Sequence, residues 1–192
     1  VEKLGNITPG NLNYVKSFSG GSESIESAIK FTRQYFKQTG YPGKYKFISR
    51  YFGYHGATFG AMSASGTGKR KTGFEPQMGG FLKVFPPTYY RDRFSTWEEC
   101  NRFCAQSFED VITNEDPETV AGIIIEPIGN TGGIITPTEE YFQIIRQICD
   151  RYNVILIYDE ILLNFHLIQS PYLLVHVQIQ YLLCYFVFDI YT

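Results

Sequence analysis

The sequence has no lysine after Lys83 and almost no charge near its end. All 17 lysine and arginine residues fall at or before Arg151, and the only charged residue after Glu160 is Asp189. This last part, residues 162–192, also has no glycine and is rich in Leu, Tyr, Ile and Val. So abrupt a change indicates a segment of different origin, such as translated intron or a shifted reading frame. A hydrophobic helix is the alternative.

Other absences exclude whole classes of function. The net charge of −2 gives no basic surface for nucleic acid or an anionic membrane. The four cysteines form no C-x-x-C pair and have no histidine at ligand spacing, so we expect no metal site. Reduced thiols fit an intracellular protein, cytoplasmic or mitochondrial. The run 172–188 is too short for a membrane span and is broken by His176, Gln178 and Gln180.

The residues before 162 have the pattern of one α/β domain. A chain of 192 residues can bury one sizeable core. Apolar runs predict strands at 45–50, 81–85, 120–125 and 154–158, and the last two are continuous, as in parallel strands covered on both faces. Helical spacing predicts helices at 23–39, from a capping box at 95–98 to about 113, and after Thr136 and Pro137. Strands that alternate with helices predict a mostly parallel sheet with flanking helices.

Three polar segments follow or flank these strands. Ligands of open parallel sheets bind beyond the carboxyl ends of the strands. The glycine-rich stretch 19–22 leads into a helix, and free N–H groups with a positive dipole end suit a phosphate there. Tyr54 and His55 follow the strand at 45–50, where an aromatic ring could stack on a planar ligand. Asp159 ends the apolar strand at 154–158, and a buried carboxylate there needs a partner such as a pyridinium nitrogen.

Each segment taken alone also has a structural interpretation. A Gly-Gly-Ser stretch before a helix is often only a turn. A tyrosine at a strand end can pack in the core beside a hydrogen-bonded histidine. An aspartate after a strand can cap a helix or bind a metal. The residue patterns leave these alternatives open.

The segments in this order resemble the class-III aminotransferases, which are pyridoxal-phosphate enzymes of fold type I. The resemblance rests on FSGGSESIESAIK at 18–30, YHGAT at 54–58, IEP at 125–127 with Gly132 and Gly133, and LIYDE at 156–160. It covers about residues 1–161. It implies that 1–161 is part of the large domain that binds pyridoxal phosphate and that 162–192 is a non-homologous tail. Intact relatives transfer an amino group from an amine or amino acid to a 2-oxo acid, usually as homodimers.

The resemblance also implies a role for each matching residue. Gly21 and Ser22 would hold the cofactor phosphate, and Tyr54 would stack on the pyridine ring. Asp159 would pair with the ring nitrogen and keep it protonated, which makes the ring an electron sink.

Three further residues belong to the same expected cofactor site. Glu126 matches the glutamate of the Glu-Pro segment that lies near the cofactor in this family. Ile161 stands where the family usually has valine, packed on the other face of the ring. His55 belongs to the motif without an assigned role.

The sequence departs from the family after Asp159. The usual Gly-Phe-Gly stretch is replaced, and the lysine that forms the Schiff base with the cofactor is absent, because no lysine follows Lys83. We therefore expect no catalytic lysine and an inactive fragment that begins at Val1 inside a longer protein and lacks the small domain. Thr131 occupies a place where some members have a second glutamate, which favours an ω-amino acid or amine donor with a pyruvate-like acceptor.

A non-catalytic product that binds the cofactor or a partner is the alternative function. For the tail, the uncharged runs at 175–181 and 184–188 predict aggregation, since they combine β-branched and aromatic residues. We also expect an open edge at the strand 154–158 if the later strands are missing. The alternative is that the tail pairs with this edge in its own molecule, although its pattern specifies no register.

Overall fold

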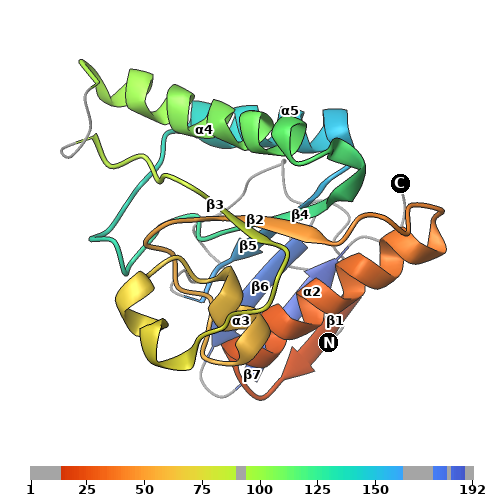
Figure 1. Ribbon diagram of the computed structural model, residues 1–192. Helices are drawn as coiled ribbons and strands as arrows, with labels where there is room; N and C mark the ends of the chain where they lie inside the picture. Colours follow the sequence, from red (N-terminus) through yellow and green to blue (C-terminus); the bar gives the residue numbers. More distant parts are fainter. Residues whose placement is uncertain (1–13, 90–93, 162–174, 181–182, 189–192) are drawn as a thin grey trace.

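The computed structural model describes residues 14–89 and 94–161, and the strands at 175–180 and 183–188 (Figure 1). These strands form one seven-stranded sheet in the order β1-β7-β6-β5-β4-β2-β3. The strands are β1 (Tyr14–Phe18), β2 (Lys46–Arg50), β3 (Phe81–Val84), β4 (Val120–Ile125), β5 (Ile155–Asp159), β6 (Val175–Gln180) and β7 (Leu183–Phe188). The α-helices are α2 (Gly21–Gln38), α3 (Phe59–Ala64), α4 (Trp97–Asn114) and α5 (Glu139–Tyr152).

The sheet is mostly parallel, which confirms the predicted α/β class. Strands β3, β2, β4, β5 and β6 pair in parallel. Only β7 runs the other way, because it pairs antiparallel with both β6 and β1. Strand β1 therefore has the same direction as β5, and its carboxyl end meets the carboxyl ends of the parallel strands at one edge of the sheet.

Helices cover both faces of the sheet (Figure 1). Helices α4 and α5 lie side by side on one face, and α2 and α3 lie on the other. The first layer packs Phe108 and Ile145 against Ile123, and the second packs Ile25 and Phe36 against Ile124. Successive side chains of a strand point to opposite faces, so Ile123 and Ile124 serve different layers. This two-sided burial explains why β4 is a continuous apolar run.

Several predicted boundaries are shifted by one or two residues. The capping box expected at 95–98 lies one residue further along the chain in the structure. Thr96 caps α4, because its side chain accepts the N–H of Glu99. The predicted cap at Thr136 is wrong, because α5 begins at Glu139 and the Thr138 side chain accepts from Tyr141 N–H at 3.3 Å. Strand β1 and helix α3 were not predicted, as both are short and lack an apolar period.

The expected open edge at 154–158 is also absent in the structure. Strand β5 pairs with β6, with Tyr158 opposite His176 and Asp159 opposite Val177. Part of the segment 162–192 therefore extends the sheet between β5 and β1. That this segment is non-homologous to the family stays a prediction.

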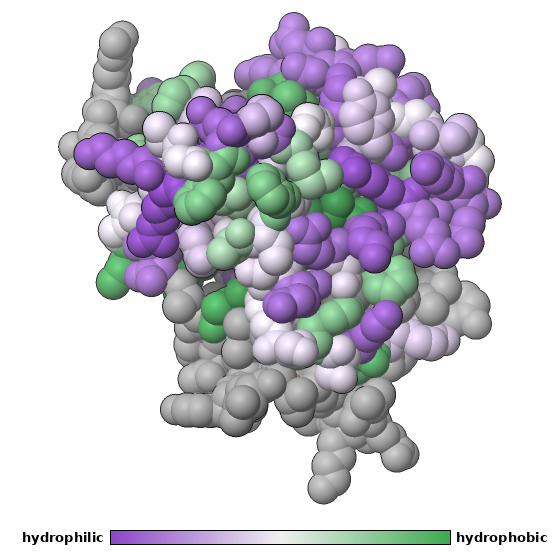
Figure 2. Space-filling model, turned by 60° about the horizontal axis from the view of Figure 1, so that its bottom comes forward, coloured by the Kyte–Doolittle hydropathy of each residue, from purple (hydrophilic) through white to green (hydrophobic). Residues whose placement is uncertain are grey.

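The hydropathy of the surface is as expected for a protein whose apolar side chains lie between its sheet and its helices. The face that carries α2 and α3 is mostly hydrophilic, with hydrophobic residues in scattered groups (Figure 2). No helix among the described residues is long and apolar enough to cross a membrane.

Candidate functional site

The polar segments singled out in the sequence meet at one edge of the sheet. Tyr54 and His55 follow β2 by a short turn, Glu126 directly follows β4, and Asp159 ends β5. Strands β2, β4 and β5 are neighbours in the sheet and run in parallel. Their carboxyl ends therefore bring these four residues together, at the place where ligands bind in such sheets.

A buried pair of Asp159 and His55 forms the centre of the site. The Asp159 Oδ2 atom lies 2.8 Å from His55 Nδ1, and both side chains are 1% exposed. Because a carboxylate only accepts, the proton on Nδ1 is donated to Asp159. The second oxygen, Oδ1, accepts the N–H of Ile161 at 3.3 Å. A hydrogen-bonded histidine thus orients the carboxylate and stabilises its charge.

Glu126 adds a second buried carboxylate beside this pair. Burial raises the pKa of Glu126, the charge of Asp159 raises it further, and His55 and Arg50 oppose the change. The Glu126 Oε2 atom accepts the N–H of Tyr54 at 3.3 Å. The Glu126 carbonyl accepts from the Arg50 guanidinium. Glu126 therefore ties the end of β4 to the segment that carries Tyr54 and His55.

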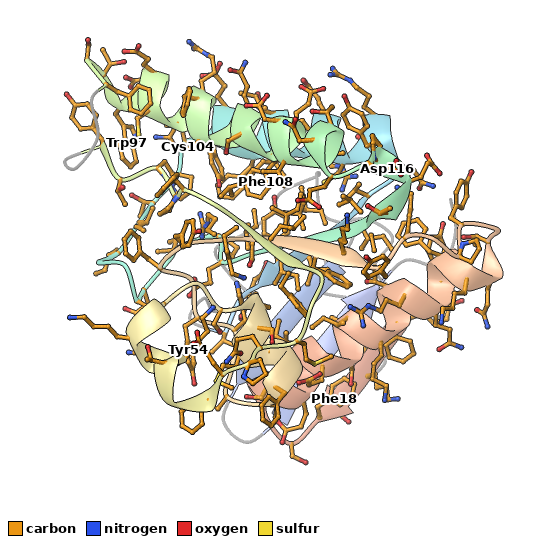
Figure 3. The ribbon with its side chains drawn as sticks, viewed as in Figure 1. Phe18, Tyr54, Trp97, Cys104, Phe108 and Asp116 are labelled. Atoms are coloured by element: carbon orange, nitrogen blue, oxygen red, sulfur yellow. The ribbon has the colours of Figure 1, made fainter. Side chains whose placement is uncertain are left out.

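Tyr54 is the most exposed of the predicted cofactor residues. The residue, which Figure 3 labels, is 39% exposed. The Arg70 guanidinium lies over the Tyr54 ring, 5.1 Å from the ring centre. The backbone of this segment is held as well, since His55 N–H donates to Ser65 Oγ at 2.8 Å. The ring is therefore free enough of the core to stack on a ligand.

The glycine-rich segment opens helix α2. Gly20 caps the helix, and Gly21 and Ser22 are its first residues. The first N–H groups of a helix have no acceptor within the helix and suit an anion. Ser22 Oγ accepts the N–H of Ala57 at 3.0 Å. The hydroxyl proton of Ser22 can therefore be donated to a phosphate.

Two residues that the sequence reasoning missed organise this edge. Ser65, at the end of α3, accepts a hydrogen bond from the backbone N–H of His55. Glu26 on α2 accepts three hydrogen bonds from residues 58–61. Glu26 could have been found, because it lies four residues after Ser22 and so on the same face of the helix. No sequence pattern indicates the contact of Ser65 with His55, because the two residues are ten positions apart and belong to no common helix or strand.

The described residues contain no group of three or more His, Cys, Asp or Glu side chains placed to hold a metal ion. The donors and acceptors of the site fit an organic ligand. Asp159 can accept from a ring nitrogen, the exposed ring of Tyr54 can stack on a planar ring, and Ser22 with the first N–H groups of α2 can donate to a phosphate. Pyridoxal phosphate has all three of these groups.

Comparison with known proteins identifies the family. The model of the class-III aminotransferases matches residues 1–164. A probable aminotransferase of Mycobacterium tuberculosis is 42% identical over 173 residues, which cover 90% of this chain and 37% of that protein. The β-alanine–pyruvate aminotransferase of Pseudomonas aeruginosa is 33% identical, over 86% of this chain and 37% of that protein.

Solved structures give the same result for the fold. An ω-transaminase from Thermomicrobium roseum superposes with a TM-score of 0.91 at 30% identity, over 98% of this chain and 46% of that chain. The ω-transaminase of Pseudomonas jessenii in complex with PMP gives a TM-score of 0.92 at 29% identity, over 98% and 45%. The sequence thus spans less than half the length of the relatives it matches. The chain belongs to the class-III aminotransferase family.

Proposed function

We propose that the described edge of the sheet binds pyridoxal phosphate, as part of the large domain of a transaminase. The observation that carries the proposal is the buried pair of Asp159 and His55 at 2.8 Å, with Glu126 and Tyr54 beside it. A buried carboxylate costs free energy unless it is paired, and a protonated ring nitrogen would add a second partner to Asp159. The family and the donor set both support this assignment.

Each residue would have a separate task in holding the cofactor. Asp159 would accept from the ring nitrogen, while His55 keeps its carboxylate oriented. Tyr54 and Ile161 would cover the two faces of the ring. Gly21 and Ser22 would donate to the phosphate, the serine through its hydroxyl proton.

When bound, pyridoxal phosphate supplies an electron sink for amino transfer. The protein's part is to keep the ring nitrogen protonated, through the charge of Asp159. Glu126 would position the segment of Tyr54 and His55 by its bond to Tyr54 N–H. The reaction of the intact protein would move an amino group from an amine or ω-amino acid to a 2-oxo acid, within a homodimer.

This chain by itself would not complete that reaction. Its last lysine is Lys83, so it has no lysine after Asp159 to bond covalently to the cofactor. Lys83 is not available to bond to the cofactor, because its ammonium donates hydrogen bonds to Ser49 Oγ, Ser63 O and Ala64 O. A chain that binds the cofactor without catalysis is therefore the second candidate function. Both candidates require the same binding site.

The test is the binding of pyridoxamine phosphate to the chain 1–192 and to Asp159→Asn. We expect the substitution to weaken binding about tenfold or more, because a charge-assisted hydrogen bond to the pyridinium is lost. The control is Asp150→Asn, whose carboxylate lies on α5 and pairs with Arg146. Equal affinities for Asp159→Asn and the parent would show that Asp159 does not face the ring. Melting curves would verify that both variants fold.

A further inference from the structure

We infer that Glu26 is a positioning residue for the cofactor, although it lies outside the predicted site. From helix α2 its carboxylate would hold residues 54–61 at a fixed distance from the residues that receive the phosphate. This inference rests on the proposed function, since it assigns a role in the binding of pyridoxal phosphate.

The carboxylate of Glu26 binds the start of helix α3 directly. Its Oε1 atom accepts the Thr58 hydroxyl at 2.6 Å, Gly60 N–H at 2.7 Å and Ala61 N–H at 3.2 Å. The threonine that precedes α3 makes no side-chain cap of its own. A negative charge at the start of a helix is favourable, and here it is supplied by another helix. Glu26 therefore replaces the missing local cap of α3.

Two glycines show how closely the two segments approach. A Cβ atom on Gly56 would lie 2.5 Å from Ser22 Oγ and 2.9 Å from the Ala61 Cβ, and Gly56 has a φ of +135°. A Cβ atom on Gly60 would overlap the carboxylate of Glu26. The backbone at Gly56 therefore lies close to the start of α2 and has little room to move toward Ser22, while Gly60 lies against the carboxylate that binds its segment.

Glu26 and Ser22 act from the same face of α2, since they are four residues apart. Ser22 accepts Ala57 N–H, and Glu26 accepts from the three donors that follow. The face that would donate to the phosphate therefore also fixes the segment that carries Tyr54. The two ends of a bound cofactor would be held by one rigid unit.

A series of hydrogen bonds continues from α3 to the centre of the site. Ser65 Oγ, at the end of α3, donates to Ala61 O at 3.0 Å and accepts His55 N–H at 2.8 Å. His55 in turn holds Asp159 at 2.8 Å. A movement of α3 would thus be passed to the histidine that orients the carboxylate. Loss of Glu26 should disturb the recognition of the ring more than that of the phosphate.

The experiment compares Glu26→Ala and Glu26→Gln with the parent chain 1–192, using pyridoxamine phosphate and inorganic phosphate as separate ligands. We expect Glu26→Ala to weaken pyridoxamine phosphate about tenfold and to change the phosphate affinity less than about twofold. Glu26→Gln keeps an acceptor at the same place and should restore most of the loss. The control is Lys30→Ala, at an exposed position one turn further along α2.

Every outcome decides the inference. Unchanged binding of pyridoxamine phosphate by Glu26→Ala would overturn it, and so would an equal loss for both ligands, which would mean that the start of α2 is damaged as a whole. A parent that does not bind pyridoxamine phosphate would overturn the proposed function itself. If Glu26→Ala does not melt cooperatively, Thr58→Val replaces it: this variant removes one donor, and a loss of about twofold to fivefold is expected.

Discussion

At the residue scale, Lys83 is a largely buried lysine in an unusual environment. Its ammonium lies under helix α3 and donates to Ser49 Oγ at 2.6 Å, Ala64 O at 2.7 Å and Ser63 O at 2.8 Å. Burial, and to a lesser extent the charge of Lys71, lowers the pKa of Lys83 to about 7. The three acceptors include two carbonyls at the end of α3, where a positive charge is favourable. Lys83 therefore links strand β3 to α3 at a cost in desolvation.

This environment predicts a pH dependence of stability. An unfolded lysine keeps its proton up to about pH 10. Because the pKa of Lys83 in the folded chain is about 7, the unfolded chain binds more protons between pH 7 and about 10. The free energy of unfolding should rise with pH across this window, relative to Lys83→Met. The expected slope is at most about 1.4 kcal/mol per pH unit.

Denaturant unfolding of both chains at several pH values measures this difference. Subtracting one from the other cancels the titration of all the groups they share. The same subtraction with the exposed Lys69→Met is the control. A difference that stays flat from pH 7 to 10 would contradict the lowered pKa of Lys83.

At the element scale, the start of α5 distinguishes two capping threonines. Thr138 accepts Tyr141 N–H with its side chain, and its own N–H donates to Asn101 Oδ1 on α4 at 2.9 Å. Thr136 is exposed and lies two residues before the cap. The bond from Thr138 N–H to Asn101 joins the two helices that cover one face of the sheet, so the position of the cap also sets how α5 packs beside α4.

We expect Thr138→Ala to lower the free energy of unfolding by about 0.5–2 kcal/mol, because it removes the side-chain acceptor of the cap. Thr136→Ala should change it by less than about 0.5 kcal/mol. Thermal or denaturant unfolding of the two single variants measures both values. A larger loss of stability for Thr136→Ala than for Thr138→Ala would support Thr136 as the cap of α5, as the sequence pattern predicts.

At the scale of the whole molecule, strands β6 and β7 decide whether the sheet is continuous. Among the strands that the structure describes, β7 is the only neighbour of β1, and β6 pairs with β5. Without them, both β1 and β5 would expose unpaired backbone groups, which recruit other chains. Helix α2 follows β1 closely, so the position of the segment proposed to bind the phosphate depends on this pairing.

We therefore expect the chain 1–161 to melt at a lower temperature and to aggregate more than the chain 1–192. The composition of 162–192 alone predicts the opposite, because an uncharged tail favours aggregation. Soluble yield, light scattering and thermal melting of the two chains compare these expectations. A sharper melt for 1–161 would support an aggregating tail and contradict the pairing of β1 with β7.

Local sequence patterns predicted the class of the fold and most of the residues proposed to hold the cofactor. The continuous apolar runs of β4 and β5 predict buried parallel strands, because only strands covered on both faces lack alternation. The family motifs give Tyr54, Asp159 and Ser22, because each motif is local. Boundaries were less certain, since neighbouring threonines such as Thr136 and Thr138 have the same chemistry and only packing selects one as the cap.

Only the tertiary structure decided the contacts between segments far apart in the chain. The pairing of His55 with Asp159 joins residues 104 positions apart, and the bond from Gly60 to Glu26 joins residues 34 apart. No local pattern encodes which strands become neighbours, and the sheet order places β4 between β2 and β5. The pairing of residues 162–192 with β5 was only an alternative at the level of the sequence, because nothing in their pattern specifies a register.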